Sequence, residues 1–286
     1  MTDFLQLVIY GVVLGSILTL GAIGVSMIFG ILRFAHFAHG DFMTVGAYIG
    51  LIFIAGLHWP VWIALPLAML GTAAVAVTID QVLYRRIRRK DPVILLISSF
   101  GMALALRSLV QIIWGPDNQV YKKGIQIPWR IEGLVIKPDH LWIVGGALLL
   151  VVIMHLFLTR TKMGKAMRAM SDNMDLALVT GIPAERVIMW TWVMGGCLAA
   201  AAGVFLGLDT RLHPVMGWFV LLPVFAAAIL GGIGRPYGAI AGGMVIGIAM
   251  EVSTIVIEPS YKLAVAFGIM VVTLIFRPQG IFKGTL

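Results

Sequence analysis

Long apolar stretches recur along the whole chain and restrict it to folds that place helices in lipid. An α-helix needs roughly 20 apolar residues to cross about 30 Å of hydrocarbon. Stretches bounded by charged or turn-forming residues predict helices over 4–30, 41–57, 60–83, 92–114, 139–158, 187–208, 217–233, 238–257 and 261–276. The sequence therefore predicts an all-α polytopic membrane helix bundle of eight or nine spans.

The composition leaves little chain for a separate water-soluble domain. Hydrophobic residues make up 60% of the 286 residues and charged residues 12%, whereas soluble proteins average about 25% charged residues. We expect one transmembrane domain over 1–286, whose first apolar stretch is a retained helix because no basic signal-peptide segment precedes it. Two weakly apolar regions rich in Gly or His, 31–45 and 231–243, are candidates for broken or re-entrant helices.

The distribution of cations predicts the orientation in the membrane. With the N-terminus outside and nine spans, most of the 21 Lys and Arg face the cytoplasm, including those of 85–90 and of 159–187, and the C-terminus is cytoplasmic. Segment 115–138, with Lys122, Lys123, Arg130 and Lys137, is then outside and is interpreted as an amphipathic surface excursion. The net charge of +8 is therefore attributed to membrane topology, and we expect no nucleic-acid partner.

Glycines spaced i, i+4 predict close helix crossings, because small residues let backbones approach within the membrane. Five pairs have this spacing: Gly11/Gly15, Gly46/Gly50, Gly203/Gly207, Gly238/Gly242 and Gly243/Gly247. Since glycine is frequent in membrane helices, each pair is weighed evenly between a contact and a chance spacing.

Motifs of soluble enzymes are absent. The glycine-rich stretch 231–235 lacks the Lys-Ser/Thr ending of a phosphate-binding loop and is followed by Pro236, so this chain is not expected to hydrolyse ATP. His36 and His39 are spaced i, i+3 beside Asp41, which suggests a metal site. A third ligand at a fitting spacing is missing, so hydrogen bonding of both histidines to backbone at a helix break is the preferred interpretation. We predict no metal and no cofactor in this chain.

Four ionisable residues fall at apparent membrane depth, where a charge costs roughly 2.5–3.5 kcal/mol. They are Asp41, Arg107, His155 and Glu251. Arg107 either pairs with Asp41 or Glu251, or lines a polar route for a zwitterionic substrate. Asp80, close to the basic run, is interpreted as an interfacial residue without a transport role.

Segment 159–187 is predicted to contain a short amphipathic helix. Apolar residues recur at i, i+3 and i+4, namely Ala166, Ala169, Met170, Met174, Ala177 and Leu178. Lys165, Arg168, Asp172 and Asp175 lie mostly off this stripe, and Gly181 with Pro183 supplies a helix stop. We expect no docking site for this helix in its own chain, so a groove on another protein is favoured, and the lipid interface is the alternative.

Three motifs give the chain a specific resemblance. Segment 30–41 reads Gly-Ile-Leu-Arg-Phe-Ala-His-Phe-Ala-His-Gly-Asp, 163–169 reads Met-Gly-Lys-Ala-Met-Arg-Ala and leads to Gly181-Ile182, and 226–234 reads Ala-Ala-Ala-Ile-Leu-Gly-Gly-Ile-Gly. Over its full length the chain resembles the LivH-type permeases of branched-chain amino acid ABC importers, in the hydrophobic amino acid uptake family. It departs at Ala35-His36, where the family usually has an apolar residue and Asn, so the resemblance assigns His36 no role.

The resemblance implies a permease subunit in a bacterial cytoplasmic membrane that forms half of a substrate pathway. Implied partners are a second related permease, two ATPase subunits that bind ATP-Mg, an extracytoplasmic solute-binding protein and the lipid bilayer. The implied substrates are branched-chain amino acids, with urea or amides, or aromatic acids, as alternatives within the family. A stand-alone secondary transporter remains an alternative, and a membrane-embedded enzyme is disfavoured because no convergent acid, base or metal groups can be assembled.

Two groups of residues are therefore the candidate sites. Those for the substrate pathway are His39, Gly40, Asp41, Arg107 and Glu251. Those for coupling to an ATPase are Gly164, Lys165, Arg168, Asp172 and Gly181.

Overall fold

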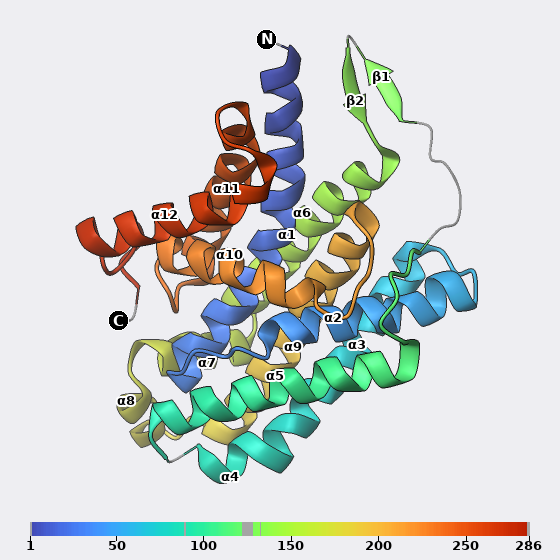
Figure 1. Cartoon of the computed structure of the whole chain (residues 1–286). Helices are drawn as coiled ribbons and strands as arrows, with labels where there is room; N and C mark the ends of the chain where they lie inside the picture. Colours follow the sequence, from blue (N-terminus) through green and yellow to red (C-terminus); the bar gives the residue numbers. More distant parts are fainter. Residues whose placement is uncertain (1, 89, 122–127, 132, 285–286) are drawn as a thin grey trace.

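The chain forms a bundle of helices of very different lengths (Figure 1). The computed structural model describes residues 2–88, 90–121, 128–131 and 133–284. Its helices are α1 (Thr2–Leu32), α2 (His39–Leu51), α3 (Val61–Ile79), α4 (Arg85–Ile87), α5 (Pro92–Trp114), α6 (Pro138–Arg160), α7 (Lys162–Asp172), α8 (Met174–Val179), α9 (Ala184–Asp209), α10 (Met216–Gly231), α11 (Pro236–Val252) and α12 (Lys262–Phe276). Two π-helical turns, Ile52–Gly56 and Asp80–Tyr84, continue α2 and α3, and two 3₁₀ turns, Ser253–Ile255 and Pro259–Tyr261, connect α11 to α12.

Eight helical segments in the described part of the chain are long and apolar enough to cross a membrane. The α10 helix is a further apolar helix of 16 residues and is too short to be counted with them. The prediction of an all-α bundle with eight or nine spans is therefore confirmed, and each predicted range overlaps one helix closely.

The excursion predicted for 115–138 contains a small β-ribbon. Strands β1 (Trp129–Ile131) and β2 (Leu134–Ile136) pair antiparallel, with Trp129 opposite Ile136. The Gln6 side chain ties the ribbon to α1, because its Nε2 donates to the Val135 carbonyl at 2.9 Å and its Oε1 accepts from the Val135 N–H at 2.7 Å. An isolated two-stranded ribbon is only marginally stable in water, so this contact with α1 supports it. Lys122 and Lys123 of this segment, and Arg89, lie outside the described residues.

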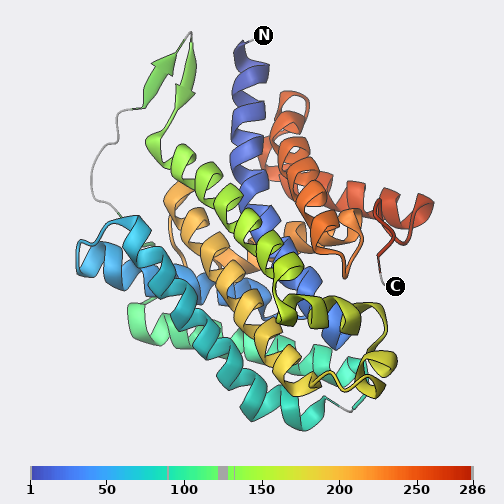
Figure 2. The same cartoon turned by 180° about the vertical axis from the view of Figure 1, so that it is seen from behind.

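The long helix α1 runs through the middle of the bundle and packs along α11 (Figure 1). Glycines on both helices make the approach possible: a Cβ added to Gly11 would lie 2.6 Å from the Ile248 Cα, and one added to Gly243 would lie 2.6 Å from the Thr19 Cα. Helix α9 packs on the other side of the core, against α1, α2 and α3 (Figure 2). There a Cβ on Gly46 would meet the Ala200 Cα, and one on Gly203 would meet the Met43 backbone. The close crossings predicted from glycine spacing are confirmed.

Two helix breaks lie where the sequence predicts them. After α1 the chain turns at Arg33, which has φ +57, and becomes helical again at His39. Between α10 and α11 the turn is made by Gly232 and Gly234, which have φ +106 and +86. The first break lets α2 start inside the bundle, where its first turn touches the first turn of α10 at Gly40 and Gly217.

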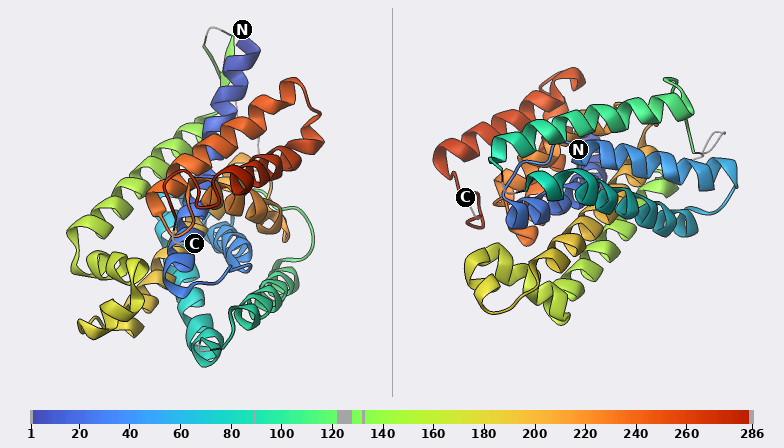
Figure 3. Two further views of the ribbon diagram at one scale, coloured as in Figure 1. Left: turned by 90° about the vertical axis from the view of Figure 1, so that its left-hand side faces the viewer. Right: turned by 90° about the horizontal axis from the view of Figure 1, so that it is seen from below.

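Several helices turn most of their apolar surface outward. In the most apolar stretch of α3, of α5 and of α6, only 28% of the residues are buried within the chain, and in that of α12 only 6% are buried. Figure 3 shows α5 and α12 at the periphery of the bundle. Apolar faces this large require lipid or another membrane subunit against them.

Candidate functional site

Arg107 and Asp41 form an ion pair between α5 and the first turn of α2. The Arg107 Nε lies 3.2 Å from Asp41 Oδ1 and its Nη2 lies 3.4 Å from Oδ2. The Asp41 side chain is 1% exposed and that of Arg107 is 16% exposed. The guanidinium also lies 5.1 Å from the centroid of the Trp218 ring, and Phe100 meets the same ring edge-on at 5.7 Å. Of the two pairings considered from the sequence, the structure forms the one with Asp41, and it places the guanidinium against the Trp218 ring with 16% of the Arg107 side chain exposed.

Glu251 does not join this pair. Its carboxylate binds the Lys262 ammonium at 2.7 Å, between α11 and α12. The alternative pairing of Glu251 with Arg107 is therefore wrong. Glu251 instead lines a separate cavity of about 280 Å³ together with His140 and Asp209. This cavity does not contain Asp41 or Arg107, so the five candidate pathway residues do not form one site.

The two histidines of the first motif are buried at the break between α1 and α2. The His36 Nε2 lies 3.2 Å from the Tyr84 hydroxyl, and its ring meets the Trp192 ring edge-on at 4.9 Å. The preferred hydrogen bond of His36 to backbone is thus replaced by one to a side chain that is distant in sequence. His39 packs beneath Gly24, where an added Cβ would lie 2.7 Å from its ring. Within the described ranges no three His, Cys, Asp or Glu side chains are arranged to hold a metal ion.

The other two ionisable residues considered from the sequence, Asp80 and His155, also have side-chain partners. Asp80 is 5% exposed and accepts two hydrogen bonds of 2.8 Å from Arg88. His155 lies on an exposed face of α6, where its Nδ1 is 2.9 Å from the Tyr237 hydroxyl. Both residues therefore contact side chains within the bundle, and neither lies beside the Arg107 pair.

The segment predicted to contain one amphipathic helix forms two. Thr161 caps α7 by accepting a 2.9 Å hydrogen bond from the Gly164 N–H, and Asn173 caps α8 by accepting a 3.0 Å bond from the Leu176 N–H. These side chains satisfy backbone donors that a helix start leaves free. The Asn173 backbone is extended, with φ −153 and ψ 105, so the helix direction changes there.

The buried face of α7 differs from the predicted stripe. Gly164, Met167 and Met170 are buried, while Ala169 is exposed. The α7 helix packs on α6, α1 and α9, so the prediction that this segment has no docking site in its own chain is wrong for α7. Gly164 makes the close packing of α7 on α6 possible, because a Cβ at this position would collide with the Phe157 carbonyl oxygen in the last turn of α6.

In contrast, α8 presents apolar side chains to the outside. Leu176 is 61% exposed, Leu178 45% and Val179 85%. The helix ends at Gly181, which has φ +85. There the Ile182 N–H bonds the Ala177 carbonyl at 3.1 Å, and the Gly181 N–H bonds the Leu178 carbonyl at 3.0 Å. This glycine cap is the stop predicted from the sequence, and it holds the exposed apolar surface in a fixed position.

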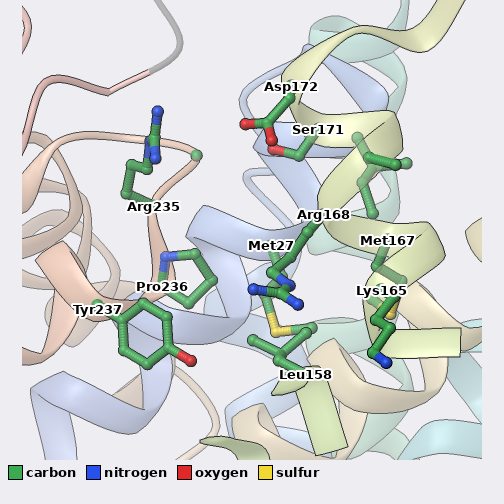
Figure 4. A pocket seen from close by; sticks show the side chains of 13 residues that line it. Met27, Leu158, Lys165, Met167, Arg168, Ser171, Asp172, Arg235, Pro236 and Tyr237 are labelled. Atoms are coloured by element: carbon green, nitrogen blue, oxygen red, sulfur yellow. The ribbon is translucent and has the colours of Figure 1, made fainter. Parts of the chain in front are cut away.

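A cavity of about 430 Å³ separates α7 from the turn between α10 and α11. Figure 4 shows Arg168, Ser171 and Asp172 of α7 facing Arg235, Pro236 and Tyr237 across it. Lys165 is a third cation in its lining, and its deeper wall is apolar, with Met27, Ile31, Leu158 and Met167.

The three motifs of the sequence meet at this cavity. A Cβ on Gly30 of the first motif would lie 2.8 Å from the Ser171 Oγ, in the segment of the second motif, and 3.2 Å from the carbonyl oxygen of Gly234, in the third. The structure thus brings together the predicted residues Lys165, Arg168 and Asp172. Arg235 and Tyr237 follow the third motif directly in the sequence but were not predicted as site residues, because no local pattern places them opposite α7.

The comparisons with known proteins agree on one family. A family profile described as the permease component of the branched-chain amino acid transport system matches residues 7–274. The chain is 32% identical to the high-affinity branched-chain amino acid transport system permease protein LivH of Escherichia coli K12, over 97% of this chain and 95% of that protein. It is 33% identical to the corresponding permease protein BraD of Pseudomonas aeruginosa, with the same coverage of both.

One solved structure supports the fold. PsaBC from Streptococcus pneumoniae in complex with Fab is similar with a TM-score of 0.53 and 15% identity, over 98% of this chain and 93% of that one. At this identity the similarity establishes a shared helical arrangement.

Proposed function

Because the chain belongs to the family of branched-chain amino acid transport system permease components, we propose that it is the permease subunit of an ATP-driven importer for branched-chain amino acids. It forms half of the translocation pathway and couples to a separate ATPase through α7 and α8. The observation that carries the coupling is the exposed apolar surface of α8, held on a helix pair that is itself anchored in the bundle. ATP-Mg binds the partner subunits, and this chain needs no cofactor of its own.

The proposed orientation places α7 and α8 in the cytoplasm and the N-terminus outside. It is supported by the cations of 85–90 and of 159–187, which the positive-inside rule assigns to the cytoplasmic face. Figure 3 shows α7 and α8 projecting at the end of the bundle away from the N-terminus. With nine spans the C-terminus is also cytoplasmic, in the inner membrane of a bacterium.

The proposed partners are those expected of a permease of this family, and the outward apolar faces of the bundle support the second permease. A second related permease covers the outward apolar faces, two ATPase subunits dock from the cytoplasm, and a solute-binding protein delivers the substrate from outside. Arg107 is the candidate pathway residue for the carboxylate of a zwitterion, because its side chain is partly exposed, at 16%, while Asp41 balances its charge. The alternatives, a permease of this family for urea, amides or aromatic acids, share this architecture and differ in the ligand delivered.

Charged substitutions on α8 test the coupling. Leu176→Asp and Val179→Asp are each expected to weaken ATPase binding at least about tenfold, because they remove apolar side chains from the contact and bury a charge there. The measurement is the affinity of the purified ATPase for the permease pair in nanodiscs. Val256→Asp is the matched control, since Val256 is 89% exposed but belongs to the connection between α11 and α12, which lies away from α8 (Figure 1). Unchanged affinity in both α8 variants would contradict coupling through this helix.

A further inference from the structure

The cavity between α7 and the α10–α11 turn contains more positive charge than the bundle uses. Lys165, Arg168 and Arg235 line it with a single carboxylate, Asp172. Within the described ranges, none of the three cations forms an ion pair of 4 Å or less or a side-chain hydrogen bond. Cations that are retained side by side without a partner in their own chain create a local field that attracts an anionic group.

The position of the cavity indicates the source of that group. It lies directly beside α7, and α7 continues through Asn173 into the exposed apolar surface of α8. Under the proposed function, an ATPase that covers α8 extends over α7 and reaches the cavity mouth. Arg168 and Arg235 are exposed, so a carboxylate that enters from outside meets their guanidinium groups before it reaches the apolar wall formed by Met27, Ile31 and Leu158.

We propose that this cavity receives a carboxylate-bearing segment of the ATPase, which Arg168 on α7 and Arg235 on the α10–α11 turn bind together. This inference rests on the proposed function and extends it to a second contact, between α7 and the α10–α11 turn. The arginines approach from separate elements, so one carboxylate bridging them fixes the distance between α7 and the start of α11. Movement of the ATPase is thereby transmitted to α11, and through its long contact with α1 to the centre of the bundle.

The ATPase affinity of charge variants tests the proposal. In nanodiscs that hold the permease pair, Arg235→Glu and Arg168→Glu are each expected to weaken ATPase binding about tenfold or more, because a charge-assisted hydrogen bond is replaced by a repulsion. Arg235→Gln should fall between these variants and the wild type. The wild-type affinity should decrease with added salt, and this salt dependence should be smaller in Arg235→Glu.

Asp172→Asn provides a test of the opposite sign. It removes the one competing carboxylate of the cavity and should strengthen ATPase binding a few-fold, which a purely structural role of Asp172 does not predict. Arg86→Glu is the matched control, because Arg86 is exposed on α4 and does not line the cavity. It should bind the ATPase within about twofold of the wild type, and unchanged gel-filtration profiles should show that all variants fold.

The proposal would be overturned if Arg235→Glu bound the ATPase with the same affinity and the same salt dependence as the wild type. So would a stabilisation of the permease pair by inorganic phosphate that is lost in Arg235→Glu, because the cavity would then be a small-anion site. Leucine uptake by the wild-type importer is measured in parallel. If uptake fails while ATPase binding depends on Arg235, the proposed substrate is wrong and the docking contact stands.

Discussion

Replacing Arg107 with leucine should destabilise the chain by about 3–5 kcal/mol, because it leaves the Asp41 carboxylate buried without a counter-charge. The Asp41 side chain is 1% exposed, so water cannot substitute for the guanidinium. The double variant Asp41→Asn/Arg107→Gln removes both charges at similar volume and should recover most of the stability. Thermal unfolding of the purified variants measures both effects. Leucine uptake by the double variant should still be reduced, because the carboxylate of the substrate loses Arg107 as its partner.

The ion pair between Lys262 and Glu251 is the matched control for this prediction. Its N–O distance of 2.7 Å is shorter than the 3.2 Å between Arg107 and Asp41, but the Lys262 and Glu251 side chains are 28% and 13% exposed. Lys262→Met should therefore cost only about 1 kcal/mol. Equal losses in Arg107→Leu and Lys262→Met would show that burial of Asp41 does not set the energetics of the first pair.

Gly40→Val is expected to prevent correct packing of α2 against α10. The added Cβ would collide with the Gly217 carbonyl oxygen and lie 3.0 Å from the Leu221 Cβ. Because the obstacle is backbone, it cannot move aside as a flexible side chain does, and we expect a loss of about 3 kcal/mol or more. The measurement is the yield of monodisperse protein together with its thermal midpoint.

Gly101→Val on α5 separates this packing effect from helix propensity. No atom lies within 4 Å of a Cβ built on Gly101, so its folding should match that of the wild type. If Gly40→Val is as stable as Gly101→Val, the contact between the two helix starts is not essential.

The helices could be predicted because a helix that crosses hydrocarbon needs a long apolar stretch, and such stretches are visible in the sequence. The two breaks were also predictable, since the Gly- and His-rich stretches 31–45 and 231–243 interrupt that signal. The β-ribbon was not, because it is held by one side chain, Gln6, more than a hundred residues away in sequence.

The candidate sites were predicted less completely, because side-chain pairing depends on how helices are placed. Sequence spacing left Arg107 with two acceptors, and only the crossing of α5 over α2 selects Asp41. The buried face of α7 differs from the predicted stripe because α7 packs on α6 through Gly164, which has no side chain. An apolar pattern does not reveal a contact made by glycine. The cavity combines residues from α1, α7 and the α10–α11 turn, and no local pattern connects those segments.

The most direct test of the account is uptake of radiolabelled leucine into vesicles that hold this chain. Uptake is compared with and without the neighbouring permease, the ATPases, the solute-binding protein and ATP. We predict uptake only with the complete set and with hydrolysable ATP. Uptake by this chain alone would contradict the account and identify a secondary transporter.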